Sequence, residues 1–199
     1  MKASGSIPFF ALFVAFTRAL TSTPQVKLGD VPSAGCLDSR LAVDFLRAYQ
    51  PKYVDHFYTT NASETNNAVF FLGYSGEGVA AYVFPWYLPP DRRPSTVPLY
   101  RMYNPKVIDH FYTTSYSEVQ SAKSLGYDYE EISAYVYNTN ICGSVALYRL
   151  YSSSGTDHFY TTSASEASNA VAKLGYTEEG IVCYVLPVPP WPYPDLILS

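Results

Sequence analysis

Apolar and polar positions follow the same order in three parts of the chain, and that order predicts the secondary structure. Residues 99–103 are aromatic and apolar, residues 104–109 carry turn-forming types, and residues 110–114 are again aromatic, a pattern typical of a β-hairpin. In residues 164–174 the apolar side chains recur every three or four positions, which is typical of an α-helix. The apolar run 181–186 follows. The predicted order is strand, strand, helix, strand.

This order returns because the sequence itself repeats. Asp-His-Phe-Tyr-Thr-Thr occurs at residues 55–60, 109–114 and 157–162. In each copy an Arg precedes the His by nine residues, and a Tyr follows that Arg by two. A Glu eight residues after the His, a Gly-Tyr pair, a further Glu and a Tyr-Val pair complete the register. So many matches in one register indicate three tandem repeats.

The helix boundaries carry local signals in every copy. A capping residue is followed three positions later by Glu, as in a capping box, and a glycine stands where the helix should end. The predicted helices are 62–72, 116–125 and 164–174, and the predicted last strands are 79–84, 132–137 and 181–186. The capping residues, the glutamates and the glycines are Asn61, Ser115 and Ser163, then Glu64, Glu118 and Glu166, then Gly73, Gly126 and Gly175.

We therefore expect an α+β fold of three tandem strand–strand–helix–strand repeats in one pseudo-threefold domain. A repeat this short cannot bury its own apolar face, so the copies should share a core, and three units favour a closed arrangement. The expected division is: signal peptide 1–19, N-terminal segment 20–40, repeat 1 at 41–85, Pro-rich linker 86–97, repeat 2 at 98–137, linker 138–145, repeat 3 at 146–186 and Pro-rich tail 187–199.

Composition and the N-terminus predict a secreted, extracellular protein. Hydrophobic residues make up 48% of the 199 residues, enough for a packed core. Lys2 followed by the short apolar run 7–16 is typical of a secretory signal and too short to span a membrane, although a buried N-terminal segment is the alternative. Cleavage after Ala19 would leave 11 basic and 17 acidic residues. An acidic body without a basic stripe argues against nucleic acid as a partner.

The cysteines and one sequon predict the covalent features. Secretion makes a disulfide plausible. We expect Cys36 to pair with Cys142, because both lie in linker-like sequence before a first strand, and Cys183 to be a free, small buried residue in a last strand. Asn61 begins the one N-x-S/T sequon and is the expected glycosylation site. No Cys/His spacing indicates a metal, and we expect no cofactor.

These motifs resemble a known repeat family of secreted fungal and bacterial proteins. Its signature joins Leu-Tyr-Arg-Leu-Tyr-Asn to Asp-His-Phe-Tyr-Thr-Thr, Gly-Tyr, Glu-Gly and Tyr-Val, and the match covers about residues 41–186. The resemblance implies an accessory module without an assigned biochemical activity, often attached to secreted hydrolases in bacteria, and it favours surface or glycan binding. The second copy departs from the signature at Glu131, where the others have Gly78 and Gly180.

The hairpin pattern places a polar and aromatic set on one face of each copy. With a loop at 104–109, Tyr103 faces His110 and Arg101 faces Tyr112, so that all four side chains share a face. Tyrosine rings with Arg and His donors suit sugars. The expected ligand-binding residues are Arg47, Tyr49, His56, Tyr58, Arg101, Tyr103, His110, Tyr112, Arg149, Tyr151, His158 and Tyr160.

A structural role for the same residues stays open, because each Arg could instead pair with a carboxylate of its own or a neighbouring copy. Capping alone accounts for Glu64, Glu118 and Glu166. The glutamates without such a local role could either close onto the arginines or contribute to a site; they are Glu77, Glu130 and Glu179. Catalysis usually needs distinct groups in distinct roles, and the three histidines are equivalent by repetition. We therefore expect a secreted, non-catalytic module that binds carbohydrate or cell-wall material. A polysaccharide hydrolase using a carboxylate pair, or a protein-interaction or structural module, remains the alternative.

Overall fold

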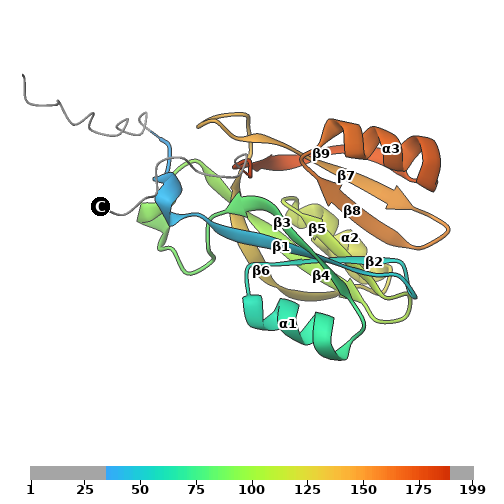
Figure 1. The fold of residues 1–199 in the computed structure, drawn as a ribbon. Helices are drawn as coiled ribbons and strands as arrows, with labels where there is room; N and C mark the ends of the chain where they lie inside the picture. Colours follow the sequence, from blue (N-terminus) through green and yellow to red (C-terminus); the bar gives the residue numbers. More distant parts are fainter. Residues whose placement is uncertain (1–34, 189–199) are drawn as a thin grey trace, which may run out of the picture. The chain divides into compact units, whose positions relative to one another are not determined.

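The computed structural model describes residues 35–188, which form nine β-strands, three α-helices and two 3₁₀ turns (Figure 1). The strands are β1 (Val43–Gln50), β2 (Asp55–Thr59), β3 (Ser75–Val83), β4 (Thr96–Asn104), β5 (Asp109–Thr113), β6 (Asp128–Tyr137), β7 (Val145–Ser152), β8 (Asp157–Thr161) and β9 (Thr177–Val185). The helices are α1 (Ala62–Phe71), α2 (Tyr116–Ser124) and α3 (Ala164–Leu174), and the 3₁₀ turns are η1 (Ser39–Leu41) and η2 (Pro90–Arg92). None of the helices described is long and apolar enough to cross a membrane.

The strands form two antiparallel sheets. One has three strands in the order β2-β1-β3, and the other has six in the order β5-β4-β6-β9-β7-β8. The second sheet is continuous because Tyr137 of β6 pairs with Tyr184 of β9. Isolated bridges from Tyr82 to Leu186 and from Phe84 to Tyr135 bring the end of β3 against the ends of β9 and β6. The first hairpin (β1–β2), the second (β4–β5) and the third (β7–β8) are the units from which the site is built.

The predicted fold class is wrong. The described residues are mostly β, in two sheets of unequal size with three short helices, and not an α+β domain of three repeats. Local patterns underestimated the strands, because β3, β6 and β9 begin about four residues before the apolar runs that predicted them. The local patterns also gave no sign that β6 and β9 pair within one sheet. The hairpin register, in contrast, is as predicted: Tyr103 pairs with His110 and Arg101 with Tyr112.

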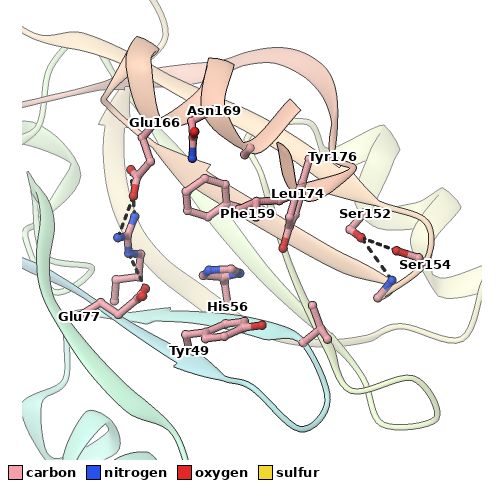
Figure 2. Close-up of a pocket in the computed structure, with 14 residues that line it drawn as sticks. Tyr49, His56, Glu77, Ser152, Ser154, Phe159, Glu166, Asn169, Leu174 and Tyr176 are labelled. Atoms are coloured by element: carbon pink, nitrogen blue, oxygen red, sulfur yellow. Dashed lines mark hydrogen bonds and ion pairs between the residues drawn. The ribbon is translucent and has the colours of Figure 1, made fainter. Parts of the chain in front are cut away.

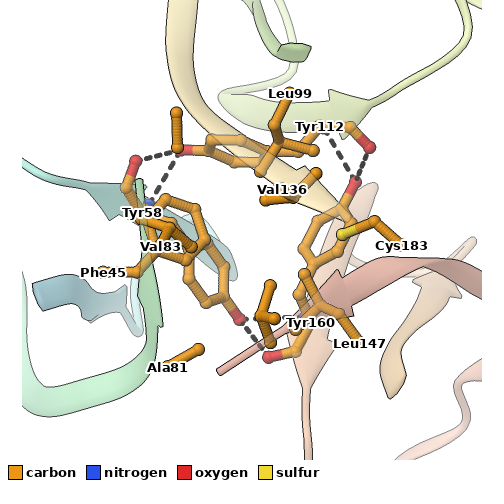
Figure 3. Close-up of a cluster of buried hydrophobic side chains, with 12 residues drawn as sticks. Phe45, Tyr58, Ala81, Val83, Leu99, Tyr112, Val136, Leu147, Tyr160 and Cys183 are labelled. Atoms are coloured by element: carbon orange, nitrogen blue, oxygen red, sulfur yellow. Dashed lines mark hydrogen bonds between the residues drawn. The ribbon is translucent and has the colours of Figure 1, made fainter. Parts of the chain in front are cut away.

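Three tyrosines close the centre of the main core (Figure 3). The hydroxyl of Tyr58 donates to the carbonyl of Tyr160 and accepts the Tyr160 amide. Tyr160 makes the same pair of bonds to Tyr112, and Tyr112 makes them to Tyr58. The three side chains are 0–1% exposed, and their rings meet edge to face at centroid distances of 5.4–5.5 Å. The six bonds satisfy polar groups that would otherwise be costly to bury.

Each helix packs on its own hairpin and begins at a side-chain cap. Asn61, Ser115 and Ser163 accept backbone amides of the first turn, as predicted. The following glycines have positive φ, which ends the helix: Gly175 is the C-cap of α3 with φ +76°. Under α2, Val119 and Ala122 contact Met102 and Phe111 of the second hairpin. This packing fixes which face of each helix stays exposed.

The cysteines are placed as predicted. Cys36 and Cys142 form a disulfide, and Cys183 is a free, buried thiol in the main core. Burial raises the pKa of the Cys183 thiol, so this thiol is unreactive. The predicted signal peptide 1–19, residues 20–34 and the tail from residue 189 lie outside the described residues.

Candidate functional site

Each hairpin is bonded to another through an Asp–His pair. Asp55 accepts the backbone amide of His110 at 2.9 Å and its ring Nδ1 at 2.8 Å, and it also accepts the hydroxyl of Tyr74. A carboxylate only accepts, so Nδ1 carries the proton and the opposite ring nitrogen, Nε2, points away from the Asp. Asp109 binds His158 and Tyr127 in the same way, and Asp157 binds His56 and Tyr176.

The three aspartates lie close together in the interior. Oxygen atoms of Asp55, Asp109 and Asp157 are within 4.8 Å of one another, and all three residues are 0% exposed. Each of the three carboxylates already accepts three hydrogen bonds, from a backbone amide, an imidazole and a tyrosine hydroxyl. This set of donors accounts for the carboxylates as part of the scaffold, and no ligand is needed to explain it.

Each histidine ring is held between two aromatic rings. His56 lies between Tyr49 of its own hairpin, at a centroid distance of 4.5 Å, and Phe159 of the third hairpin, at 4.7 Å (Figure 2). His110 lies in the same way between Tyr103 and Phe57, and His158 between Tyr151 and Phe111. Both faces of the imidazole are therefore covered, and its edge is the part that a ligand can reach.

Each arginine joins two carboxylates from different parts of the chain. Arg47 lies 2.8 Å from Glu77 and donates to Glu166 of α3 at 3.1 and 3.2 Å (Figure 2). Its guanidinium also lies over the ring of Phe159. Arg149 pairs in the same way with Glu179 and Glu118, and Arg101 with Glu130 and Glu64.

Three clefts lie where one hairpin meets the helix of another. The Arg47 cleft has a volume of about 620 Å³ and the Arg149 cleft about 510 Å³, whereas the Arg101 cleft has only about 160 Å³. The Arg47 cleft is bounded by Tyr49 and His56 on one side and by Asn169 and Leu174 of α3 on the other (Figure 2). The corresponding wall of the Arg149 cleft carries Ser121 and Leu125.

Arg101 differs from the other two arginines because a third carboxylate, that of Glu131, also binds it. Glu131 Oε1 lies 3.2 Å from Arg101 Nη1, and the Arg101 side chain is 6% exposed, against 16% for Arg47 and 12% for Arg149. The strand residues that pair with Arg47 and Arg149 are instead glycines with positive φ, Gly78 and Gly180. The arginine with the additional carboxylate thus lines the smallest of the three clefts.

Four carboxyl groups near the arginines have shifted pKa values, those of Glu64, Glu118 and Glu166 on the helices and of Glu131 on β6. Burial alone would raise the pKa of Glu64, but hydrogen bonds from Arg101 and Thr59 and the Arg101 charge hold it below its ordinary value of 4.5. The pKa values of Glu118 and Glu166 are lowered in the same way by Arg149 and Arg47. Glu131 is the opposite case, because burial, together with the charges of Glu64 and Glu130, raises its pKa although the Arg101 charge lowers it.

Glu64→Gln should destabilise the protein at neutral pH, and the difference from the natural protein should vanish in acid. A carboxyl whose pKa is lower in the folded state stabilises the fold above its unfolded pKa, and this contribution is lost as pH falls through the folded pKa, here below 4.5. The Glu131 carboxyl has a raised pKa, so its ionised form destabilises the fold. Glu131→Gln should therefore leave the stability at neutral pH unchanged or raise it. Urea unfolding of both variants across this pH range is the measurement; equal losses in the two would contradict the assignment.

The structure separates the predicted ligand-binding residues into two groups. Arg47, Tyr49 and His56 line one cleft, and Arg149, Tyr151 and His158 line another. Arg101 and His110 line the small third cleft, while Tyr103 stacks on His110 but is not part of its lining. Tyr58, Tyr112 and Tyr160 lie in the core, bonded to backbone groups, where no ligand can reach them. We therefore leave these three out of the candidate site.

Sequence reasoning missed the role of the helix glutamates. Capping explained Glu64, Glu118 and Glu166 locally, yet their carboxylates accept a threonine hydroxyl and a distant arginine. The wall residues Asn169 and Ser121 were also missed, because only the packing of a helix beside another hairpin places them in a cleft. Asn61, the predicted glycosylation site, is exposed at the start of α1, and its modification stays a prediction.

Fold and site together define a mostly β domain whose hairpins are joined by Asp–His pairs with buried carboxylates and by partly exposed Arg–Glu pairs. Clefts lie where the hairpins and helices meet. The chain belongs to the family described as a domain of unknown function, DUF5648, whose model matches residues 44–186. No curated protein and no solved structure matches the chain.

Proposed function

We propose that this protein is a secreted, non-catalytic module that binds carbohydrate or cell-wall material in the Arg47 and Arg149 clefts. The observation that carries the proposal is the lining that both clefts share. Each joins a half-buried tyrosine, the edge of a histidine and two carboxylates to apolar side chains and a neutral polar residue of a helix. Sugars present apolar C–H faces beside many hydroxyl groups, so they need this mixture of flat apolar surface and directional hydrogen bonds.

The size and construction of the clefts support the same function. Volumes of about 620 and 510 Å³ are in the range of small-molecule sites. The side chains of their hairpin walls are fixed by ion pairs and stacked rings, so little conformational freedom would be lost on binding. Secretion belongs to the proposal: the apolar run near the N-terminus suits a signal peptide, and the Cys36–Cys142 disulfide suits an oxidising compartment.

A hydrolase is less well supported than a binding module. Glycoside hydrolysis needs one carboxylic acid with a raised pKa to protonate the leaving group. In the two large clefts Glu118 and Glu166 have lowered pKa values, and each is held by an arginine. These groups suit a permanent negative charge better than proton donation.

The test begins with the mature protein on a glycan array, followed by titration calorimetry with the glycans that bind. Asn169→Trp and Ser121→Trp place a large ring in each of the two clefts from exposed helix positions. The double variant should weaken binding roughly tenfold or more, and each single variant should remove one of two sites. Ser168→Trp and Gln120→Trp, one residue away on the same helices, are the matched controls.

Two results would contradict the proposal. An array without any bound glycan would remove its basis and favour a protein partner. Unchanged affinity in the double variant, with a melting temperature like that of the natural protein, would move the binding site away from these clefts. Hydrolysis of a polysaccharide that is lost in Glu166→Gln would favour the enzyme instead.

A further inference from the structure

We propose that the Arg47 and Arg149 clefts select glycans that carry protonated amino groups, such as oligomers of glucosamine, over neutral and acidic glycans. This inference rests on the proposed function and adds the chemical class of the ligand to it. It starts from the distribution of charge in the two clefts.

Negative charge exceeds positive charge in both clefts. Among the residues that line the Arg47 cleft, Arg47 is the one arginine or lysine, and it faces the carboxylates of Glu77 and Glu166. Behind the cleft, His56 is bonded to the buried carboxylate of Asp157. The balance is negative by at least one charge, even with a protonated imidazole. The Arg149 cleft has the same composition, with Glu118, Glu179 and Asp109.

The negative groups are also the more accessible ones. The side chains of Glu77 and Glu166 are 32% and 40% exposed, whereas that of Arg47 is 16% exposed. In the other cleft Glu179 and Glu118 are 31% and 41% exposed, and Arg149 is 12% exposed. A ligand entering either cleft therefore meets two glutamate side chains that are more accessible than the guanidinium bound to both. This geometry attracts an ammonium group and repels a uronic acid or a sulfate.

The remaining lining suits a sugar that carries this ammonium. The Tyr49 ring lines the Arg47 cleft beside the carboxylates, and the face of an aromatic ring stabilises a cation as well as a pyranose face. Because Arg47 and Arg149 keep Glu166 and Glu118 ionised, the carboxylates stay charged under mildly acidic conditions, where amines are protonated. Acid should therefore preserve the interaction.

The Arg101 cleft predicts how many sites there are. Its volume is about 160 Å³, and Glu64, Glu130 and Glu131 all bind its arginine. A sugar ring with its hydroxyl groups does not fit there beside a side chain already bound to three carboxylates. We therefore expect two sites per chain.

The experiment compares three probes of equal length on the full mature protein by titration calorimetry, at mildly acidic pH and low salt. The probes are a glucosamine hexamer, its fully N-acetylated form and a galacturonic acid hexamer. The glucosamine hexamer should bind at least tenfold more tightly than the acetylated form, at two sites, and salt should weaken it. The galacturonate should not bind.

Glutamate variants test whether the amino sugar binds in these clefts, and a basic peptide tests whether its charge alone is enough for binding. Glu179→Gln should weaken the Arg149 site, while Glu178→Gln, the exposed neighbour on β9, should change affinity less than about twofold. A variant that fails to fold leaves the comparison of probes on the natural protein as the test. Equal binding of the acetylated probe would overturn amine selection and leave the proposed function standing. Binding of no probe, with an empty array, would remove both. A lysine hexapeptide that binds as tightly as the amino sugar would overturn the sugar as ligand.

Discussion

Tyr160→Phe is expected to destabilise the protein by about 4 kcal/mol, although it removes a single oxygen atom. The Tyr160 hydroxyl donates to the carbonyl of Tyr112 and accepts the Tyr112 amide. Without it, two backbone groups in the core lose their partners, and the buried, mostly apolar side chains around them offer no replacement. Each unpaired buried group costs about 1–3 kcal/mol. Urea unfolding at neutral pH, with the slope checked for a two-state transition, measures the loss.

The matched control is Tyr116→Phe on α2. This side chain is 60% exposed, so its hydroxyl is solvated in both the folded and the unfolded protein, and the change should cost less than about 0.5 kcal/mol. Tyr58→Phe and Tyr112→Phe should resemble Tyr160→Phe, because each hydroxyl closes the same pair of bonds. A loss below about 1 kcal/mol in all three would show that the cyclic bonds contribute little, and that ring packing alone holds the core.

Local signals predicted local structure well. The caps at Asn61, Ser115 and Ser163 and the glycines after each helix gave the helix boundaries within one residue, because capping involves only nearby atoms. The hairpin register also followed from strand alternation and loop length. The pairing of Cys36 with Cys142 followed from the position of both residues before a first strand. Each of these inferences needed no knowledge of which hairpin lies beside which.

The candidate site was predicted only in part, because alternation assigns side chains to a face without saying what covers that face. Arg101, His110 and Tyr112 do share a face of the second hairpin. One end of that face, at Tyr112, meets the other two hairpins and becomes core, while the end near His110 borders a cleft. One partner of each arginine, Glu130 for Arg101, was among the alternatives that the sequence offered, whereas Glu64, 37 residues from Arg101, was hidden.

The fold class failed for a related reason. Repeated sequence predicted three similar units, yet the backbone joins β6 to β9 and leaves β1, β2 and β3 as a separate sheet. The difference depends on the pairing of Tyr137 with Tyr184, at the end of two strands that look alike in the sequence. Such a contact carries no local signal, because linker length and packing decide which strand edges meet.

Asp109→Ala is expected to have the largest effect, about 5 kcal/mol, and to unfold much of the protein at room temperature in moderate urea. Asp109 is 0% exposed and accepts the amide and the ring Nδ1–H of His158 and the hydroxyl of Tyr127. Alanine leaves these three donors without an acceptor in the interior, and it also removes the Asp109–His158 link between the second and third hairpins, which leaves the Tyr112–Tyr160 bonds between them.

A competing effect decides how Asp109→Ala is interpreted. The carboxylates of Asp55, Asp109 and Asp157 approach one another within 4.8 Å, so removing one charge relieves repulsion. Asp109→Asn separates the two effects, because it removes the charge but keeps one oxygen that can accept a hydrogen bond. We expect the asparagine variant to lose about half as much stability as the alanine variant. Asp44 is an exposed residue on β1, so Asp44→Ala is the control and should change the stability little.

An asparagine variant more stable than the natural protein would show that repulsion between the aspartates outweighs the hydrogen bonds that they accept. In that case the three Asp–His pairs would be a cost of the fold and not its support, and their presence in every hairpin would need a functional explanation.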